Sequence, residues 1–267
     1  MLIEETLFGT VNKVKVAIAR LKLHEPKEGY YVAFSGGKDS IVVKDLVLRA
    51  GVKCDIHHNI TTVEPPELIY YIRQHHPDVI NDLPKETMWE LIEKNGTPPT
   101  RLMRYCCRTQ KEIGGEGRVC VTGIRHEESV NRSGRQIVET CKNRNGKKFL
   151  HPIIDWTESE VWEYIETCKL PYCKLYDEGH SRIGCVMCPF SGQKGMQRDA
   201  QLWPKIANMY RFACEKAYQK RLKQGKDMKN WSSGDDMYNW WLTGKAPEKE
   251  VVGQTAIYGL MADESIT

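Results

Sequence analysis

The sequence has no apolar run of the roughly 18 residues that a membrane-spanning helix requires. Its first ten residues include Glu4 and Glu5 and lack the basic-then-apolar order of a secretory signal peptide. Internal repeats and low-complexity segments are also absent. These absences argue against a membrane, secreted or repeat protein, and we expect a cytoplasmic protein that makes no contact with a membrane.

Two familiar nucleotide-binding signatures are missing as well. The sequence contains no G-x-x-x-x-G-K-S/T motif, and no G-x-G-x-x-G fingerprint follows a predicted strand. The pairs His57–His58 and His75–His76 are not accompanied by a further acidic or histidine cluster, so we assign them no metal-binding role. A nucleotide site in this chain must therefore be built differently from those of P-loop NTPases and Rossmann enzymes.

The composition that is present is typical of a soluble globular protein. The 267 residues are 40% hydrophobic and 28% charged, enough for one large domain or for a main domain with an appendage. The formal charge of +4 suits a phosphate-bearing ligand without identifying nucleic acid as a partner. Ten cysteines in a reducing compartment are read first as metal ligands or catalytic thiols, not as disulfides.

Alternating strand and helix patterns predict an α/β fold with a doubly wound parallel sheet. A polar, basic stretch over 132–148 is expected to form a mobile surface loop, and Thr157 with Glu160 predicts a capping box at a helix start. Helical, aromatic sequence dominates after Cys188. The expected strands are 30–34, 54–60 and 118–124, and the expected helices are 5–22, the segment ending at Gly51, and the segment ending near His76.

A glycine-rich loop, SGGKDS, lies between the first strand and its helix. Its glycines allow backbone N–H groups to approach a phosphate closely, and the helix that follows directs its partial positive charge at the same point. The lysine adds a full charge, the serines add hydroxyl donors, and the aspartate either caps the helix or helps to hold Mg²⁺. The alternative is a plain turn before a solvated helix. The residues are Ser35, Gly36, Gly37, Lys38, Asp39 and Ser40.

This loop resembles the PP-loop of the ATP-pyrophosphatase superfamily, whose fold is the adenine nucleotide alpha hydrolase-like one. Later motifs resemble the phosphoadenosine-phosphosulfate (PAPS) reductase branch, and together they cover about residues 30–190. They are Asn59–Glu67 (NITTVEPPE), Val121–Arg125 (VTGIR), His151-Pro152 with Asp155-Trp156, Val161-Trp162, and Ser181–Cys185 (SRIGC).

The resemblance implies a set of site residues. Catalytic roles fall to Lys38, Asp39 and Arg125. Nucleotide binding falls to the six loop residues together with Thr61, Thr62, Gly123 and Arg125, and Mg²⁺ is expected to accompany ATP.

Four cysteines form the second constellation. Cys106 and Cys107 are adjacent, and Cys185 and Cys188 form a C-x-x-C. Four thiolates suit either Zn²⁺ or a [4Fe–4S] cluster, and ligand chemistry alone does not separate these two. The resemblance to adenylyl-sulfate (APS) reductases favours the cluster. A three-cysteine cluster with an open iron and a set of buried cysteines remain as alternatives.

The chain contains further arginines near this constellation in the sequence and further cysteines elsewhere. Arg101, Arg104 and Arg108 are placed to offset its negative charge and to attract an anionic substrate. Cys173 is kept as a reserve ligand. The remaining cysteines are expected to be packing or surface residues: Cys54, Cys120, Cys141, Cys168 and Cys214.

The chain departs from the sulfonucleotide reductases at its end. These enzymes carry a nucleophilic cysteine in a tail motif, whereas residues 251–267 contain none and the last cysteine, Cys214, is expected to lie in a helix core. We therefore predict an ATP pyrophosphatase that adenylylates a substrate for sulfur transfer, with the cluster carrying or delivering sulfur. The alternatives are an APS or PAPS reductase that uses another thiol, and a non-catalytic nucleotide-binding module of a larger assembly.

This interpretation gives a domain division and a set of partners. Residues 1–194 form the PP-loop nucleotide-binding domain with the iron–sulfur site, and 195–267 form the C-terminal helical region. The partners are an adenine nucleotide, a sulfur donor such as a cysteine desulfurase or a thioredoxin-like protein, and nucleic acid as candidate acceptor; a homodimer is a candidate assembly. The basic segment Lys216–Lys229 either contacts phosphates or is a solvated helix face, and Trp231, Trp240 and Trp241 either stack bases or pack together.

Overall fold

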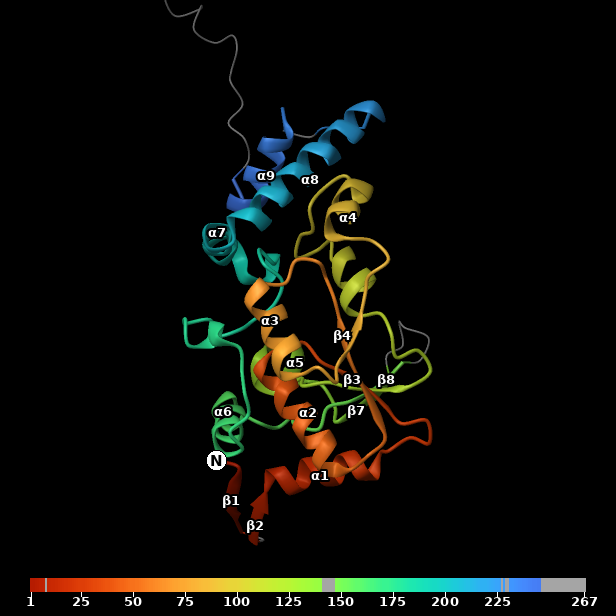
Figure 1. Ribbon diagram of the computed structural model, residues 1–267, viewed down its shortest axis with the longest axis vertical. Coiled ribbons are helices and arrows are strands. Elements are labelled where there is room, and N and C mark those ends of the chain that lie inside the picture. Colours follow the sequence, from red (N-terminus) through yellow and green to blue (C-terminus); the bar gives the residue numbers. More distant parts are fainter. Residues whose placement is uncertain (8, 141–146, 227, 229–230, 246–267) are drawn as a thin grey trace, which may run out of the picture.

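The computed structural model describes residues 1–7, 9–140, 147–226, 228 and 231–245, and the statements below concern those residues (Figure 1). Cys141, Lys229 and residues 246–267, which the predictions above name, lie outside the described residues. None of the described helices is long and apolar enough to cross a membrane.

A six-stranded sheet organises the molecule, in the order β5-β4-β3-β6-β8-β7. Five strands run parallel, and β7 pairs antiparallel with β8 at one edge. Flanking helices cover this sheet (Figure 1), which confirms the predicted α/β fold. The strands are β3 (Tyr30–Ala33), β4 (Cys54–Asn59), β5 (Ile80–Asp82), β6 (Val119–Val121), β7 (Val138–Thr140) and β8 (Lys148–Leu150).

The predicted opening helix over 5–22 is wrong in its first half. Strands β1 (Ile3–Thr6) and β2 (Gly9–Asn12) form an antiparallel hairpin, and helix α1 (Lys13–Leu23) begins only after it. Gly9 adopts a φ of +113°, which suits the turn, and the β-branched Thr10 and Val11 favour an extended backbone. The side chain of Asn12 then starts the helix by accepting a hydrogen bond from the Lys15 N–H at 3.0 Å.

The helices after the first two parallel strands are as the sequence predicts. Helix α2 (Lys38–Ala50) follows the glycine-rich loop and ends at Gly51 with a φ of +68°. Helix α3 (Pro66–His75) follows β4, and α4 (Met88–Asn95) starts with a capping box made by Thr87 and Glu90. The apolar face of α2 packs into the main core, where Val42, Val43 and Leu46 are fully buried.

The expected loop over 132–148 is partly structured. Helix α5 (Val130–Ser133) and strand β7 lie within it, and residues 141–146 fall outside the described part. The loop prediction fails at β7 because the β-branched Val138 and Thr140 pair with β8, whose register joins Val138 to Leu150.

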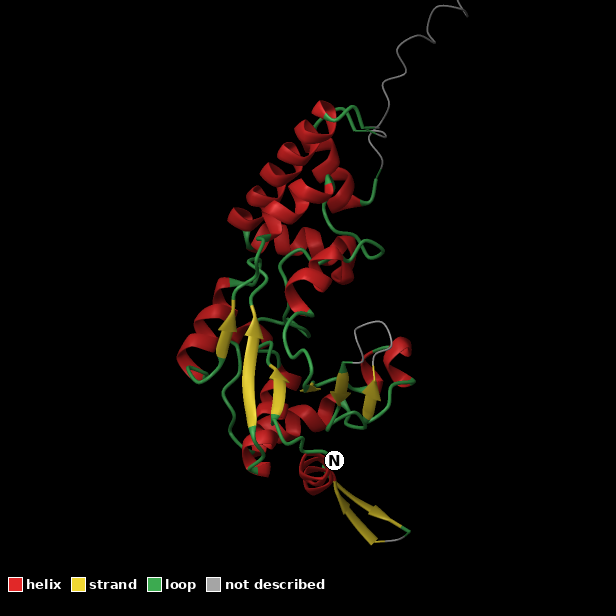
Figure 2. Cartoon of the chain, turned by 90° about the vertical axis from the view of Figure 1, so that its right-hand side faces the viewer, coloured by secondary structure: helices red, strands yellow, loops and turns green. Residues whose placement is uncertain are grey.

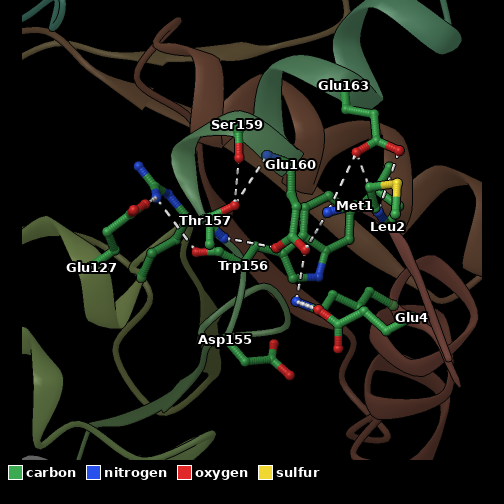
Figure 3. A network of polar contacts seen from close by, with 12 residues as sticks. Met1, Leu2, Glu4, Glu127, Asp155, Trp156, Thr157, Ser159, Glu160 and Glu163 are labelled. Carbon is green, nitrogen blue, oxygen red and sulfur yellow. Dashed lines mark hydrogen bonds and ion pairs between the residues drawn. The ribbon is translucent and has the colours of Figure 1, made fainter. Parts of the chain in front are cut away.

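The predicted capping box at Thr157 is confirmed. The Thr157 hydroxyl accepts from the Glu160 N–H at 3.2 Å, and the Glu160 carboxylate accepts from the Thr157 N–H at 2.8 Å. Glu160 also binds the ammonium of Lys13 at 2.7 Å, so the start of α6 (Glu158–Thr167) is tied to the N-terminal segment (Figure 3).

Three helices form the far end of the molecule, beyond the tips of the parallel strands (Figure 2). They are α7 (Gly192–Leu202), α8 (Pro204–Lys223) and α9 (Gly234–Thr243). They share a second hydrophobic cluster with Met88 and Ile92 of α4 and with Val63. Packing therefore crosses the boundary at residue 194, and the two-domain division stays a prediction. Trp231 and Trp241 are buried in this cluster, as expected for packing residues.

Candidate active site

The glycine-rich loop is shaped by close packing against α3. Gly36 has a φ of +72°, and a Cβ added there would lie 2.7 Å from Leu68 Cδ1. The two serines hold the loop together: Ser40 Oγ donates to the Gly37 carbonyl at 2.8 Å and accepts from the Ser35 N–H at 3.2 Å. The loop thus needs glycine for its conformation as well as for access to a ligand.

Lys38 begins α2 and is only 5% exposed. Its ammonium donates to the Ser181 carbonyl at 2.9 Å and lies 3.2 Å from a carboxylate oxygen of Glu158 at the start of α6. Its backbone N–H donates to the Tyr176 hydroxyl at 2.9 Å. One loop lysine therefore connects three segments that are distant in sequence.

Asp39 is held by Arg125, which is 3% exposed. The guanidinium donates to Asp39 at 2.6 Å and to Glu127 at 2.9 Å, and these carboxylates raise the pKa of Arg125 although burial opposes them. Gly123 allows this approach, because an added Cβ would lie 3.0 Å from Asp39 backbone atoms. Gly123 and Arg125, which follow β6, therefore both contact Asp39 of the glycine-rich loop.

A cavity of about 470 Å³ opens above this unit, and we call it the loop cavity. It brings together seven of the predicted residues, whereas no cysteine is among the described residues that line it. Those seven are Ser35, Gly37, Lys38, Asp39, Ser40, Gly123 and Arg125.

A second cavity of about 250 Å³ lies between the ends of β3 and β4, and we call it the side cavity. It shares Ala33, Ser35, Arg182 and Ile183 with the loop cavity, so one elongated ligand can occupy both.

The two threonines predicted to bind nucleotide, Thr61 and Thr62, lie in different places in the structure. Thr61 lines the side cavity, where its hydroxyl donates to Glu64 at 2.7 Å. Thr62 has a φ of +66°, and its hydroxyl accepts from the Met88 N–H at 3.0 Å at the start of α4. The structure therefore places Thr62 at a helix start and not on either cavity, while its predicted nucleotide contact stays a prediction.

The fold brings the four predicted cysteines together from two segments 77 residues apart. Cys106 precedes and Cys107 begins a π-helical turn (Cys107–Lys111), and the other two belong to the loop before α7. A hydrogen bond from Cys106 lowers the pKa of Cys107 to about 6, and the same bond raises the pKa of Cys106. Negative charge on Cys185 and Cys188 also raises the pKa of Cys106. We call these residues the cysteine cluster.

Cationic and polar side chains surround the cysteine cluster. Charge on Cys185 raises the pKa of Lys111, which lines the side cavity with it. Arg104 lies beside Cys107 and helps to lower the pKa of that thiol. The Thr61 hydroxyl lies 3.2 Å from Cys185 Sγ. The environment thus stabilises the thiolate of Cys107, the form in which cysteine binds a metal, whereas burial raises the pKa of Cys188.

The spacing of these thiols bears on the choice of metal. No group of three or more His, Cys, Asp or Glu side chains in the described ranges is arranged to hold a metal ion. A [4Fe–4S] cluster carries its four thiolates on separate irons and holds them further apart than one ion does. A [4Fe–4S] cluster at these four thiols therefore stays a prediction.

The other described cysteines lie elsewhere. Cys214 is 0% exposed in α8, and burial raises its pKa to about 12. Cys173 is buried in the main core, apart from the cysteine cluster. Cys54, Cys120 and Cys168 are buried or half-buried, and the role of Cys173 as a reserve ligand stays a prediction.

A third cavity, of about 430 Å³, borders the cysteine cluster on the side of α7, and we call it the basic groove. Asp199 is its one acidic residue among the described ones, and its carboxylate accepts from the Met187 N–H at 2.9 Å. Both Cys185 and Cys188 line the groove. Its basic residues are Lys111, His180, Arg182, Lys194 and Arg198.

Sequence reasoning missed Tyr176, Glu158 and Lys111 as site residues. Tyr176 and Glu158 meet Lys38 from segments that flank the recognised motifs, but no spacing rule marks them. Lys111 lies four residues after Cys107, one helical turn away, and this spacing was the available signal.

A mostly parallel sheet with flanking helices, and a glycine-rich loop after the central strand β3, is the architecture that the sequence predicts. The family model described as "Phosphoadenosine phosphosulfate reductase domain" matches residues 29–191. The chain belongs to this family.

Relatives share different parts of the chain. An uncharacterized protein of Methanocaldococcus jannaschii is 34% identical over 71% of this chain and 43% of its own length. The chain thus spans less than half of that relative. An adenosine 5'-phosphosulfate reductase of Bacillus anthracis is 27% identical over 77% of this chain and 96% of its own length. A crystal structure of PAPS reductase from Candida auris, a phosphate complex, has a TM-score of 0.49, with 20% identity over 63% of this chain and 87% of that one.

Proposed function

We propose that this protein is an ATP pyrophosphatase that adenylylates a substrate oxygen and thereby prepares it for replacement by sulfur. The observation that carries the proposal is the segment Arg182–Cys185. Its first residues line the loop cavity, and its last residue belongs to the cysteine cluster. A nucleotide site and a thiol site on one short segment fit a reaction that activates a substrate and then delivers sulfur to it.

The first step is a displacement at phosphorus. The substrate oxygen forms a bond to the α-phosphorus, the bond from that phosphorus to the bridging oxygen breaks, and pyrophosphate leaves with the electron pair. Lys38 and Mg²⁺ brought with ATP stabilise the charge that develops on the leaving phosphates. Arg125 fixes Asp39 beside them. A sulfur nucleophile from a donor protein then displaces AMP from the activated substrate.

The cysteine cluster is the proposed ligand set of a [4Fe–4S] cluster, held by Cys106, Cys107, Cys185 and Cys188. The fit rests on four thiols from two segments, with Lys111 and Arg104 offsetting their charge. Bound there, the group would supply sulfur-carrying or electron-carrying chemistry next to the nucleotide.

A sulfonucleotide reductase is the second candidate, favoured by the match to 96% of the Bacillus anthracis reductase. It requires a nucleophilic thiol that reaches the nucleotide. Cys214 does not meet this requirement, because it is fully buried among α8 and α9 side chains and its pKa is raised to about 12.

One assay separates these two functions. Anaerobically purified protein is offered either ATP with Mg²⁺, with water as the acceptor, or APS or PAPS with excess dithiothreitol as the two-electron reductant. Pyrophosphate and sulfite are then measured. We expect pyrophosphate from ATP and no sulfite from the other two. Sulfite from APS or PAPS would contradict the proposal, and its persistence in Cys214→Ala would show that the thiol lies elsewhere.

The basic groove supports nucleic acid as the sulfur acceptor. Its exposed cations Arg182, Lys194 and Arg198 lie next to Cys185. Phe190 at its edge is 43% exposed, and the Arg104 guanidinium lies 4.8 Å from the ring centre. Positive charge with an accessible aromatic ring is the combination that binds single strands.

This gives a salt-dependence prediction. The double variant Lys194→Ala/Arg198→Ala should weaken binding of a single-stranded oligonucleotide and reduce the slope of log K against log salt by about one to two. Fluorescence anisotropy across a salt series measures both quantities. The matched variant Lys220→Ala/Lys223→Ala removes the same charge from α8 and should have the smaller effect. A larger effect of the Lys220→Ala/Lys223→Ala variant would indicate that the nucleic acid binds to the α8 surface instead of the basic groove.

A further inference from the structure

A short strap, which we define as Ser181–Gly184, lies between the glycine-rich loop and the cysteine cluster. The carbonyl of Ser181 accepts from the Lys38 ammonium at 2.9 Å, and within the described part of the chain this is the only hydrogen bond that the strap makes. Ser181 and Arg182 are exposed, and Ile183 packs half-buried against the main core. A segment with a single polar anchor and exposed residues leaves its contacts at a low cost in free energy.

Tyr176, five residues before the strap, contacts the same lysine. Its hydroxyl accepts from the Lys38 backbone N–H at 2.9 Å, and a Cβ added to Gly37 would lie 3.4 Å from that hydroxyl. The Lys38 ammonium lies 5.6 Å from the centre of the Tyr176 ring. Burial raises the pKa of Tyr176, so the hydroxyl stays neutral. Tyr176 and Ser181 together therefore engage the backbone donor and the side-chain donor of the first residue of α2.

A phosphate at the glycine-rich loop requires the same two donors. The N–H groups at a helix start, and a lysine beside them, are the groups that bind phosphate oxygens. A backbone N–H carries one hydrogen, so that of Lys38 cannot serve the Tyr176 hydroxyl and a phosphate oxygen fully at once. The ammonium carries three hydrogens, and it already donates to the Ser181 carbonyl and lies 3.2 Å from Glu158. The chain's own oxygens and phosphate oxygens are therefore alternatives at Lys38.

We infer that Tyr176 and the strap are internal competitors for the phosphate site, and that a pyrophosphate group binds there by displacing the Tyr176 hydroxyl and the Ser181 carbonyl from Lys38. The inference rests on the phosphate-binding part of the proposed function and not on the reaction. Displacement removes the polar anchor of the strap, and Arg182 of the strap lines the loop cavity, the side cavity and the basic groove. Phosphate binding thereby changes the lining of all three cavities.

Binding of inorganic pyrophosphate with Mg²⁺ to the full chain tests the competition. Tyr176→Phe removes the hydroxyl that competes for the Lys38 N–H, so calorimetry should show about fivefold tighter pyrophosphate binding than in the wild type. The Tyr176 ring packs edge-on against Trp162 with centroids 5.0 Å apart, and phenylalanine can keep this contact. Tyr172→Phe is the matched control, because that hydroxyl donates to Asp177 at 3.0 Å instead of contacting Lys38, and its affinity should equal that of the wild type.

Tryptic cleavage after Arg182 tests the displacement of the strap in the wild-type protein. Saturating pyrophosphate should accelerate this cleavage severalfold, because proteolysis follows the population in which a segment is open. Cleavage after Lys27, an exposed residue in the loop before β3, is the internal control and should not change. Mass spectrometry of the fragments assigns each site.

The outcomes are distinct. Unchanged or weaker pyrophosphate binding by a folded Tyr176→Phe protein would overturn the competition, and weaker binding would make the hydroxyl a phosphate ligand. Protection of Arg182 by pyrophosphate would overturn the displacement, even if the phenylalanine protein fails to fold. Wild-type protein that binds no pyrophosphate would contradict both the inference and the proposed nucleotide site. Tighter binding by Tyr176→Phe with faster cleavage, but without pyrophosphate release from ATP, would support the inference and contradict only the proposed reaction.

Discussion

Lys38→Ala is expected to lower pyrophosphate release from ATP by roughly a hundredfold or more, the loss typical of removing one preorganised charged donor from a phosphoryl-transfer site. The lysine begins α2, where the helix dipole already favours an anion, and its side chain is 5% exposed. A charge in a site largely shielded from water acts more strongly than the same charge on the surface.

Part of this effect is set by the neighbours of Lys38. Its ammonium lies 3.2 Å from a carboxylate oxygen of Glu158 and donates to the Ser181 carbonyl at 2.9 Å. Phosphate oxygens compete with these groups for the ammonium. Glu158→Gln therefore should tighten ATP binding modestly, the reverse of the effect of removing the lysine.

Steady-state pyrophosphate release, measured with saturating ATP and Mg²⁺, is the readout. Lys22→Ala on the exposed surface of α1 removes the same charge and should retain wild-type rates. Thermal unfolding of both variants separates a lost charge from a lost fold. Wild-type release by a folded Lys38→Ala protein would show that the loop lysine has no part in the reaction.

Cys188→Ser should cause the second large effect, the loss of most of the iron and acid-labile sulfide bound after anaerobic reconstitution. Wild-type protein should bind about four irons per chain with the visible absorbance of an iron–sulfur protein. Serine is a much poorer ligand for iron than cysteine, and the remaining three thiols can bind only three of the four irons. Metal binding also contributes to folding, so the variant should unfold at a lower temperature than the loaded wild type.

Cys168→Ser is the matched control, because this half-buried cysteine lies in the segment after α6 and away from the cysteine cluster. It should bind iron as the wild type does. One zinc per chain without sulfide would contradict the cluster and support a single-ion site. Full iron loading in Cys188→Ser, with loss in Cys173→Ser, would make Cys173 the fourth ligand.

The sequence predicted those features that depend on neighbouring residues. The capping box at Thr157 and Glu160, the strand before the loop and the helix after it all follow from local spacing. The hairpin before Lys13 was missed because the apolar residues of 1–12 also fit a helical period, and only the turn at Gly9 decides between the two.

The sequence predicted which residues belong to the site, but it did not predict which of them contact one another. Arg125 and Asp39 are 86 residues apart, and nothing local shows that they form a 2.6 Å ion pair. Thr61 and Thr62 look equivalent in the sequence, yet the left-handed backbone at Thr62 turns its side chain to α4. The Nε2 atom of His58 is buried without a hydrogen-bond partner in the described part of the chain, and this depends on β3, β4 and α3 together, so it becomes visible only in three dimensions.

The segment Arg182–Cys185 borders all three cavities, because each of them is lined by Arg182 and Ile183. A ligand that displaces this segment from the loop cavity also displaces the Cys185 thiol. Thermodynamic reciprocity then requires that, if nucleotide binding changes the affinity for iron, iron changes the affinity for nucleotide by the same factor. Because these four residues connect the linings of the three cavities, the metal content of the protein should be measured alongside every nucleotide affinity.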